Sequence, residues 1–172
     1  MTTGARVHAR LNLHIGAQQT VVSPIDAMQG SATAEPVVPT DLVAPLVLGL
    51  GFEQIAHLHF KRDIPTALEL EYAIQTVEDQ VVRARTLVAP GTWLTSSDIN
   101  LREIAKVAHG HSTLPAVLTL EEVESTFDHL AAVSLGRPTA SEGLLPGKSY
   151  AATLLILREF MHHLQCPGLY VS

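Results

Sequence analysis

Histidines and basic residues alternate with apolar residues in two short stretches of this 172-residue chain. The first stretch is residues 7–15 and the second is residues 56–62. A period of two is typical of half-buried β-strands, whose successive side chains point to opposite faces of a sheet. If both strands belong to one sheet, their polar sides form a single surface. We call this predicted surface the histidine face, and its members are His8, Arg10, His14, His57, His59, Lys61 and Arg62.

The chemistry of the predicted histidine face favours anions over metal ions. His57 and His59 form a His-x-His pair that suits zinc when a third ligand is available. However, Arg10 and Lys61 would repel a cation, and neither polar side carries an aspartate or glutamate. We therefore predict no metal site. Two interpretations stay open: the face binds a small anion through its cationic donors, or it is an ordinary solvated or dimer-buried surface.

The junction that follows Lys61 and Arg62 adds a weak signal for anion binding. A helix is predicted to begin at Pro65, so its free N–H groups would lie near these two basic side chains. No glycine-rich turn is present to bring the backbone close to a phosphate. Lys61 and Arg62 are therefore included as candidate ligand-binding residues.

Two further motifs resemble known sites but lack the context that those sites need. Glu159 and His162 have the Glu-x-x-His spacing of di-iron bundles, yet the chain has no second such pair. Glu159 and His163 are interpreted instead as a surface pair one helical turn apart. Residues 143–149 have three residues between their glycines, where a phosphate-binding loop needs four. This segment is predicted to be a turn, with Ser149 capping the last helix.

Composition limits the class of protein. With 172 residues and 47% hydrophobic residues, the chain can bury the core of one domain, and a homodimer is plausible. The net charge of −6 argues against nucleic-acid binding. The single cysteine, Cys166, excludes an internal disulfide and fits a reducing cytoplasm. Residues 1–16 lack a signal sequence, and the longest apolar runs are shorter than the roughly 18 residues of a membrane span.

The pattern along the chain predicts a single α+β domain over residues 1–172. Strands are expected mainly within residues 7–62 and helices mainly within residues 65–166. The expected architecture is a small, mainly antiparallel sheet of about three strands, packed on one face by a long helix and three C-terminal helices. The predicted helices cover residues 40–50, 65–85, 98–108, 119–135 and 149–166, and a short extended piece surrounds Trp93.

The functional hypothesis follows from the histidine face. We expect a non-enzymatic cytoplasmic binding or interaction protein that uses this face for a small anionic ligand or for a homodimer partner. No cofactor, nucleic acid or membrane is expected. The alternative is an enzyme that uses His57 and His59, either a metal-dependent hydrolase or an acid/base enzyme acting on a phosphorylated substrate. An enzyme would need a carboxylate or a metal within reach of these imidazoles.

Overall fold

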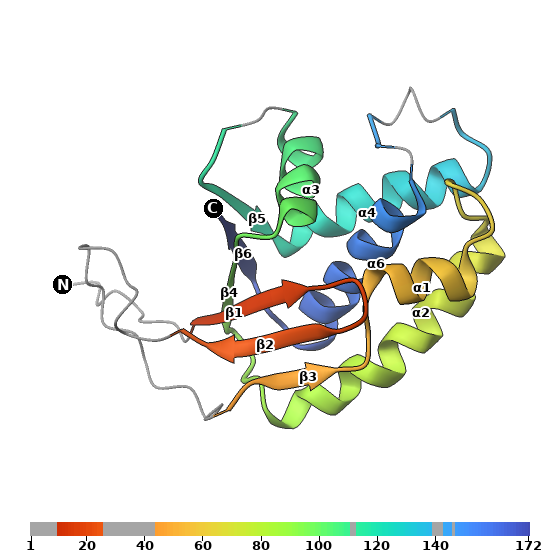
Figure 1. The fold of residues 1–172 in the computed structure, drawn as a ribbon. Coiled ribbons are helices and arrows are strands. Elements are labelled where there is room, and N and C mark those ends of the chain that lie inside the picture. Colours follow the sequence, from red (N-terminus) through yellow and green to blue (C-terminus); the bar gives the residue numbers. More distant parts are fainter. Residues whose placement is uncertain (1–9, 26–43, 111–112, 139–142, 146) are drawn as a thin grey trace.

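A six-stranded mixed sheet forms one layer of the protein (Figure 1). The computed structural model describes residues 10–25, 44–110, 113–138, 143–145 and 147–172. Its strand order is β3-β2-β1-β4-β6-β5. The strands are β1 (Arg10–Ile15), β2 (Thr20–Pro24), β3 (Leu46–Leu48), β4 (Trp93–Ser96), β5 (Ala116–Thr119) and β6 (Gly168–Val171).

Both parallel and antiparallel pairs hold this sheet together. β1 pairs with β4 and β4 with β6 in parallel, whereas the β1–β2, β2–β3 and β5–β6 pairs are antiparallel. The α+β class fits, but the predicted small, mainly antiparallel sheet of about three strands is wrong. The hairpin of β1 and β2 was expected, but β5 and β6 were missed because they have four residues each and lie beside helices.

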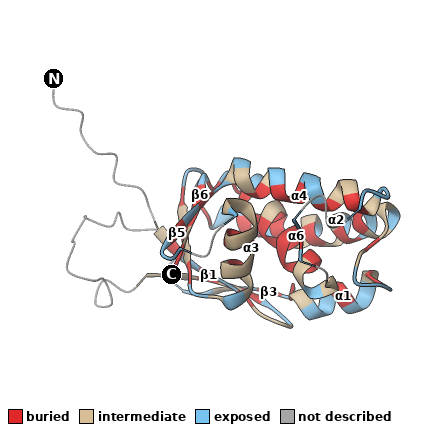
Figure 2. Ribbon diagram, turned by 90° about the horizontal axis from the view of Figure 1, so that it is seen from above, coloured by how far each residue is buried: buried red, intermediate tan, exposed pale blue. Residues whose placement is uncertain are grey.

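The helices form a second layer around one central helix. They are α1 (Phe52–His59), α2 (Ala67–Val81), α3 (Ile99–His109), α4 (Leu120–Ser134) and α6 (Lys148–His163), with a 3-10 turn at Val82–Thr86. Figure 2 shows α6 between α1, α2, α3 and α4. Residues 151–157 of α6 are all buried. No helix among the described residues is long and apolar enough to cross a membrane.

Capping boxes fix the starts of two predicted helices. In α2 the hydroxyl of Thr66 accepts from the backbone N–H of Glu69, and the Glu69 carboxylate accepts from the backbone N–H of Thr66. Thr119 and Glu122 form the same arrangement at the start of α4. These reciprocal bonds satisfy N–H groups that a helix leaves unpaired in its first turn. The predictions of helices near residues 65–85 and 119–135 are confirmed.

Two predicted elements have a different structure. Residues 46–48 form β3, where a helix over residues 40–50 was predicted, and residues 40–43 lie outside the described part of the chain. Residues 52–59 form α1, so the predicted strand at His57 and His59 is wrong. In α1, Ile55 and Ala56 are buried while Leu58 is exposed. This burial pattern follows the helical period and not the alternation of a strand.

The two faces of the sheet differ in burial. Leu11, Leu13 and Ile15 point from β1 into the core with the helices, and they are at most 2% exposed. Arg10, Asn12 and His14 point to the opposite side. The register places Arg10 beside Trp93 and Asn12 beside Thr95, so these four side chains share the second face.

Candidate functional site

The structure does not bring the predicted histidine face together. Arg10 and His14 do lie on the same side of β1, and His8 lies outside the described residues. The Arg10 guanidinium carbon sits 4.7 Å from the centre of the Tyr170 ring. His57 and His59 belong to α1 and not to a strand. The prediction that these histidines share one sheet face is therefore wrong.

The remaining members of that predicted surface also lie elsewhere. Lys61 and Arg62 are exposed in the segment after α1. The Nε2 atom of His59 is buried without a hydrogen-bond partner among the described residues. Burial lowers the pKa of His59, because a buried imidazole is less easily protonated. His59 is thus a poor candidate for binding an anion.

The parallel strands define an edge of the sheet where ligands commonly bind. In open α/β sheets, ligands bind beyond the carboxyl ends of parallel strands. Here β1, β4 and β6 are parallel neighbours. Their carboxyl ends lead into the turn at residues 16–19, into Ser97 and Asp98, and into Ser172. We call this region the carboxyl edge.

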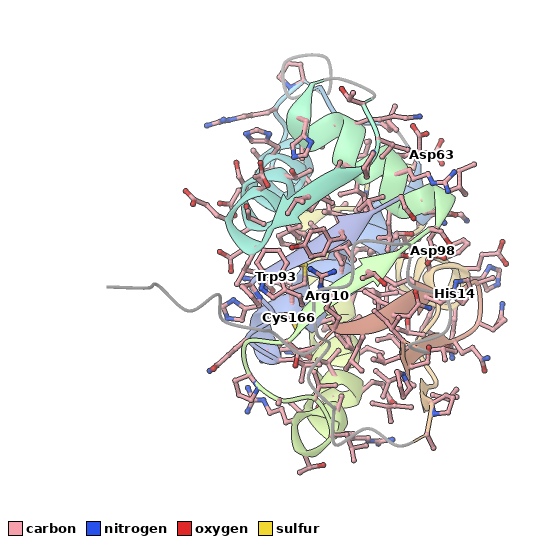
Figure 3. All side chains as sticks on the ribbon, turned by 90° about the vertical axis from the view of Figure 1, so that its left-hand side faces the viewer. Arg10, His14, Asp63, Trp93, Asp98 and Cys166 are labelled. Carbon is pink, nitrogen blue, oxygen red and sulfur yellow. The ribbon has the colours of Figure 1, made fainter. Side chains whose placement is uncertain are left out.

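A histidine and an aspartate are held together at the carboxyl edge. The Nδ1 atom of His14 lies 2.7 Å from Oδ1 of Asp98. The backbone N–H of Ile15 donates to Oδ2 of the same carboxylate, at 2.8 Å. Asp98 occupies the N-cap position of α3, but its side chain makes no capping hydrogen bond. The carboxylate therefore orients His14 instead of capping the helix. Figure 3 shows the two side chains at this edge.

A polar hollow of about 450 Å³ lies at the neighbouring residues Asn12 of β1 and Thr95 of β4. Among the described residues that line it, none has a charged side chain. Several carry hydroxyl groups, so we call it the serine hollow. It is lined by Asn12, Ser23, Pro24, Ile25, Thr95, Ser96, Ser97 and Ser172.

A second hollow, of about 610 Å³, lies between α1 and the beginning of α6. We call it the lysine hollow, and it is lined by Gln18, Glu53, Gln54, Ala56, His57, Leu58, Lys148 and Ser149. Gln18 belongs to the turn between β1 and β2, so this hollow also lies at the carboxyl edge. Gly147 is the N-cap of α6, which corrects the prediction that Ser149 caps this helix.

The lysine hollow combines groups that can bind and react with an anionic ester. The Lys148 ammonium supplies positive charge, and the Ser149 hydroxyl can donate a hydrogen bond. The His57 imidazole can accept or donate a hydrogen bond. Glu53, one helical turn before His57 on α1, supplies a carboxylate. The enzyme alternative required a carboxylate near these imidazoles, and this hollow provides one for His57.

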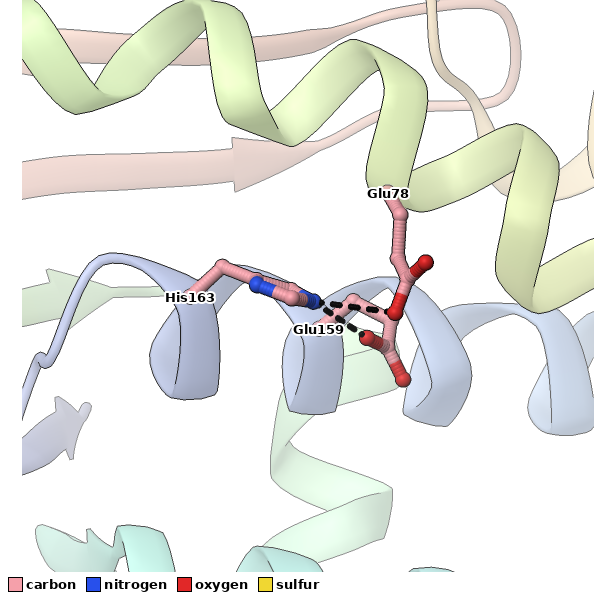
Figure 4. Close-up of side chains that lie close together, drawn as sticks. All are labelled: Glu78, Glu159 and His163. Carbon is pink, nitrogen blue, oxygen red and sulfur yellow. Dashed lines mark hydrogen bonds and ion pairs between the residues drawn. The ribbon is translucent and has the colours of Figure 1, made fainter.

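Three other side chains gather between α2 and α6 (Figure 4). The Nε2 atom of His163 lies 3.2 Å from Oε1 of Glu78 and 3.1 Å from Oε2 of Glu159. The Glu159 side chain is fully buried and also pairs with Arg158. The interpretation of Glu159 and His163 as a simple surface pair is therefore wrong. Their spacing on the helix is as expected, but α2 covers the carboxylate.

The hydrogen bonds of His163 identify this cluster as a charge network. Arg85 Nη2 lies 3.2 Å from His163 Nδ1, and arginine can only donate. Nδ1 must then carry a lone pair, so the ring proton is on Nε2 and faces Glu78. A metal would need the lone pair of that same nitrogen. Arg158 pairs with Glu159 and Arg85 contacts His163, so we assign the cluster a structural role.

Cys166 is also not a candidate nucleophile. It is buried, and burial raises the pKa of its thiol to about 12. Near neutral pH the thiol is therefore protonated, and the thiolate is the reactive form.

Sequence reasoning missed Asp98 and Lys148 as site residues. Asp98 begins the helix predicted over residues 98–108, and capping is the usual role of an aspartate at the start of a helix, so no other partner was expected for it. Its contact with His14 joins residues 84 positions apart. Lys148 was set aside when the glycine spacing failed to match a phosphate loop. Neither segment contains a local sequence pattern that predicts which distant residues the fold places beside Asp98 or Lys148.

Comparison with known proteins gives a fold likeness only. No family model matches the chain, and no curated protein matches it. A Ppx/GppA phosphatase of Aquifex aeolicus is similar to 96% of this chain at a TM-score of 0.68 and 13% identity. An exopolyphosphatase-like protein is similar to the whole of this chain, with a TM-score of 0.67 and 14% sequence identity. An exopolyphosphatase of Cytophaga hutchinsonii is similar to 99% of this chain, with a TM-score of 0.63 and 9% sequence identity.

The likeness corrects the first functional hypothesis. The chain spans 53%, 58% and 55% of the lengths of these three proteins. The non-enzymatic hypothesis depended on a histidine face that the structure does not form. The fold is instead shared with proteins that are described as phosphatases and exopolyphosphatases. The prediction of a non-enzymatic protein that uses the histidine face for a small anion or a homodimer partner is therefore corrected: that face does not form, and the fold is the one found in these proteins.

Proposed function

We propose that this chain carries a phosphate-ester hydrolase site in the lysine hollow. One observation carries the proposal: Lys148, Ser149 and His57 line one hollow at the carboxyl edge. The fold likeness to proteins described as phosphatases supports the reaction class. The single cysteine supports a reducing cytoplasm as the location.

The proposed reaction assigns a separate task to each group. Lys148 pairs with the phosphate oxygens, and the Ser149 hydroxyl donates to one of them. His57 takes a proton from a water molecule, whose oxygen forms the new bond to phosphorus while the ester P–O bond breaks. The imidazolium then returns this proton to the leaving oxygen. Glu53 is a candidate positioning residue for His57.

Hydrolysis of p-nitrophenyl phosphate tests the proposal. His57→Gln should lower kcat by about 10²-fold or more, the usual contribution of acid/base catalysis. Lys148→Gln should raise KM by roughly tenfold, because it removes one charged contact of about 1.5 kcal/mol. Lys61→Gln is the matched control, since Lys61 is an exposed lysine outside the residues that line the hollow.

The variants also distinguish hydrolysis at this site from hydrolysis by a contaminating phosphatase. Activity that is equal in wild type, His57→Gln and Lys148→Gln would contradict the proposed site. Absence of phosphate release by the wild-type protein would contradict the hydrolase assignment itself. An equal loss in Lys61→Gln would show that lysine substitution acts through overall charge and not through this hollow.

A further inference from the structure

The charges that line the lysine hollow balance each other. Among the described residues that line it, Lys148 carries the positive charge and Glu53 the negative charge. Gln18, Gln54 and Ser149 are polar but uncharged. A single phosphate group can pair with the Lys148 ammonium. A second phosphate would find no further lysine or arginine in this described lining, and the Glu53 carboxylate would repel it.

One wall of the hollow suits the phosphate group of a ligand. This wall is the first turn of α6, which supplies Lys148 and Ser149. The N-cap of α6 is Gly147, which has no side chain to accept from the N–H groups of this turn. Unpaired N–H groups at the start of a helix favour an anion. A phosphate is therefore expected to lie beside the start of α6.

The opposite wall is α1, and it presents an apolar side chain beside His57. Leu58 lines the hollow and is 67% exposed. Single exposed leucines are common on protein surfaces, but this one shares a hollow with the Lys148 ammonium. It is the largest apolar side chain among the described lining residues. At about 610 Å³ the hollow falls within the usual range of ligand pockets, roughly 300–1,000 Å³, so an organic group fits beside the phosphate.

We infer that the lysine hollow binds a phosphate monoester whose organic group is apolar, and that it discriminates against chains of several phosphates. The phosphate lies against Lys148 and Ser149, and the organic group lies against Leu58. Leu58 is the specificity-determining residue, because only an apolar group gains from covering its side chain. Glu53 acts in the same direction, since its charge disfavours a second phosphate. The inference rests on the proposed phosphate site and adds the class of ligand.

Three phosphonates test the ligand class without depending on hydrolysis, because they lack the P–O ester bond that the proposed reaction breaks. They are methylphosphonate, phenylphosphonate and methylenediphosphonate, and each is titrated while the Lys148 and Ser149 amide signals are followed by NMR. Phenylphosphonate should bind about tenfold more tightly than methylphosphonate, because its ring covers apolar surface at Leu58. Methylenediphosphonate should bind no more tightly than methylphosphonate, although it carries a second phosphonate group.

Variants locate this preference at Leu58. Leu58→Asn should reduce the tenfold preference to about twofold or less and leave methylphosphonate binding unchanged. Leu68→Asn is the matched control, because Leu68 is 58% exposed on α2 and lies outside the described residues that line the hollow. Glu53→Gln should strengthen the binding of methylenediphosphonate by about threefold, since it removes the repelling charge.

The outcomes separate the ligand class from the proposed hydrolysis. Equal binding of methylphosphonate and phenylphosphonate, tighter binding of methylenediphosphonate, or a preference that survives in Leu58→Asn would overturn the inference and leave the phosphate site in place. Selective binding of phenylphosphonate without hydrolysis of p-nitrophenyl phosphate would contradict the hydrolase assignment and support the ligand class. Absence of binding by all three probes would overturn both.

Discussion

Replacement of Gly51 by alanine should strongly destabilise the protein and distort the lysine hollow. Gly51 immediately precedes α1, and a Cβ at this position would lie 2.2 Å from the carbonyl oxygen of Ala17. Backbone atoms cannot move aside as a flexible side chain can. The φ angle of Gly51 is −123°, which any residue adopts, so the whole effect is steric. The turn between β1 and β2 would have to separate from α1.

The expected loss of stability follows from the contacts that this separation breaks. The N–H groups of Phe52 and Glu53 donate to the carbonyls of Gly16 and Ala17, each at 3.0 Å. A shift from 2.2 Å to an ordinary contact of at least 3.4 Å would stretch both bonds. Overpacking costs about 1–3 kcal/mol, and each weakened hydrogen bond about 0.5–1.5 kcal/mol. We expect a total of about 2–6 kcal/mol.

Urea denaturation measures this loss against a nearby control. Gly49→Ala is the matched variant, because its added Cβ would meet no atom within 4 Å. Gly49→Ala should change the free energy of unfolding by no more than about 0.5 kcal/mol. With a slope of roughly 2 kcal/mol per molar urea, Gly51→Ala should lower the midpoint by about 1–3 M. Equal midpoints for the two variants would refute the close approach of Gly51 to the turn.

Three further substitutions test the helices and the open sheet face. Leu155→Ala should lower the free energy of unfolding by about 2–5 kcal/mol in urea denaturation, because this side chain is fully buried in α6. The Thr119 N–H lowers the pKa of Glu122 below its ordinary value of 4.5, so the resulting stability is present above pH 4.5 and is lost as pH falls further. Glu122→Gln, which keeps an acceptor, should therefore reduce the loss of stability in acid melting curves. Gly168→Ala would place a Cβ 2.3 Å from the Trp93 ring and should shift the fluorescence of this single tryptophan; an unchanged spectrum would contradict that contact.

Local periodicity predicted the long helices but failed for α1. The five residues from Ala56 to Phe60 alternate between apolar and polar types, as a strand would. The helical spacing becomes visible only when Phe52 and Ile55 are included, since buried or half-buried positions then recur every three or four residues. A window of five residues covers less than two helical turns. It therefore cannot separate the two periods.

The sheet could not be predicted in full because most of its pairings join distant segments. β1 pairs with β4, which follows it by about 80 residues, and β6 enters between β4 and β5. Strands of four residues carry too little pattern to be separated from loops, as β5 and β6 show. The order of strands follows from how the helices pack on the buried face. That packing is not encoded in any single segment.

His59 makes the stability of the protein depend on pH. Burial lowers the pKa of this imidazole. His59 then favours the unfolded state once the unfolded imidazole protonates, so its contribution is present above pH 6.5 and is lost as pH falls further.

The position of the two hollows explains why residue type alone pointed to the wrong surface. His57 and His14 were grouped by a shared alternation, yet His57 lines the lysine hollow and His14 contacts Asp98 at the carboxyl edge. The partner that matters for each comes from another segment: Lys148 begins α6, and Asp98 follows β4. Both pairs, Lys148 with His57 and Asp98 with His14, lie at the carboxyl edge, where the parallel strands bring distant chain segments together. The chemistry of this edge is therefore a product of topology, and each histidine acquires its role from the residue that the fold places beside it.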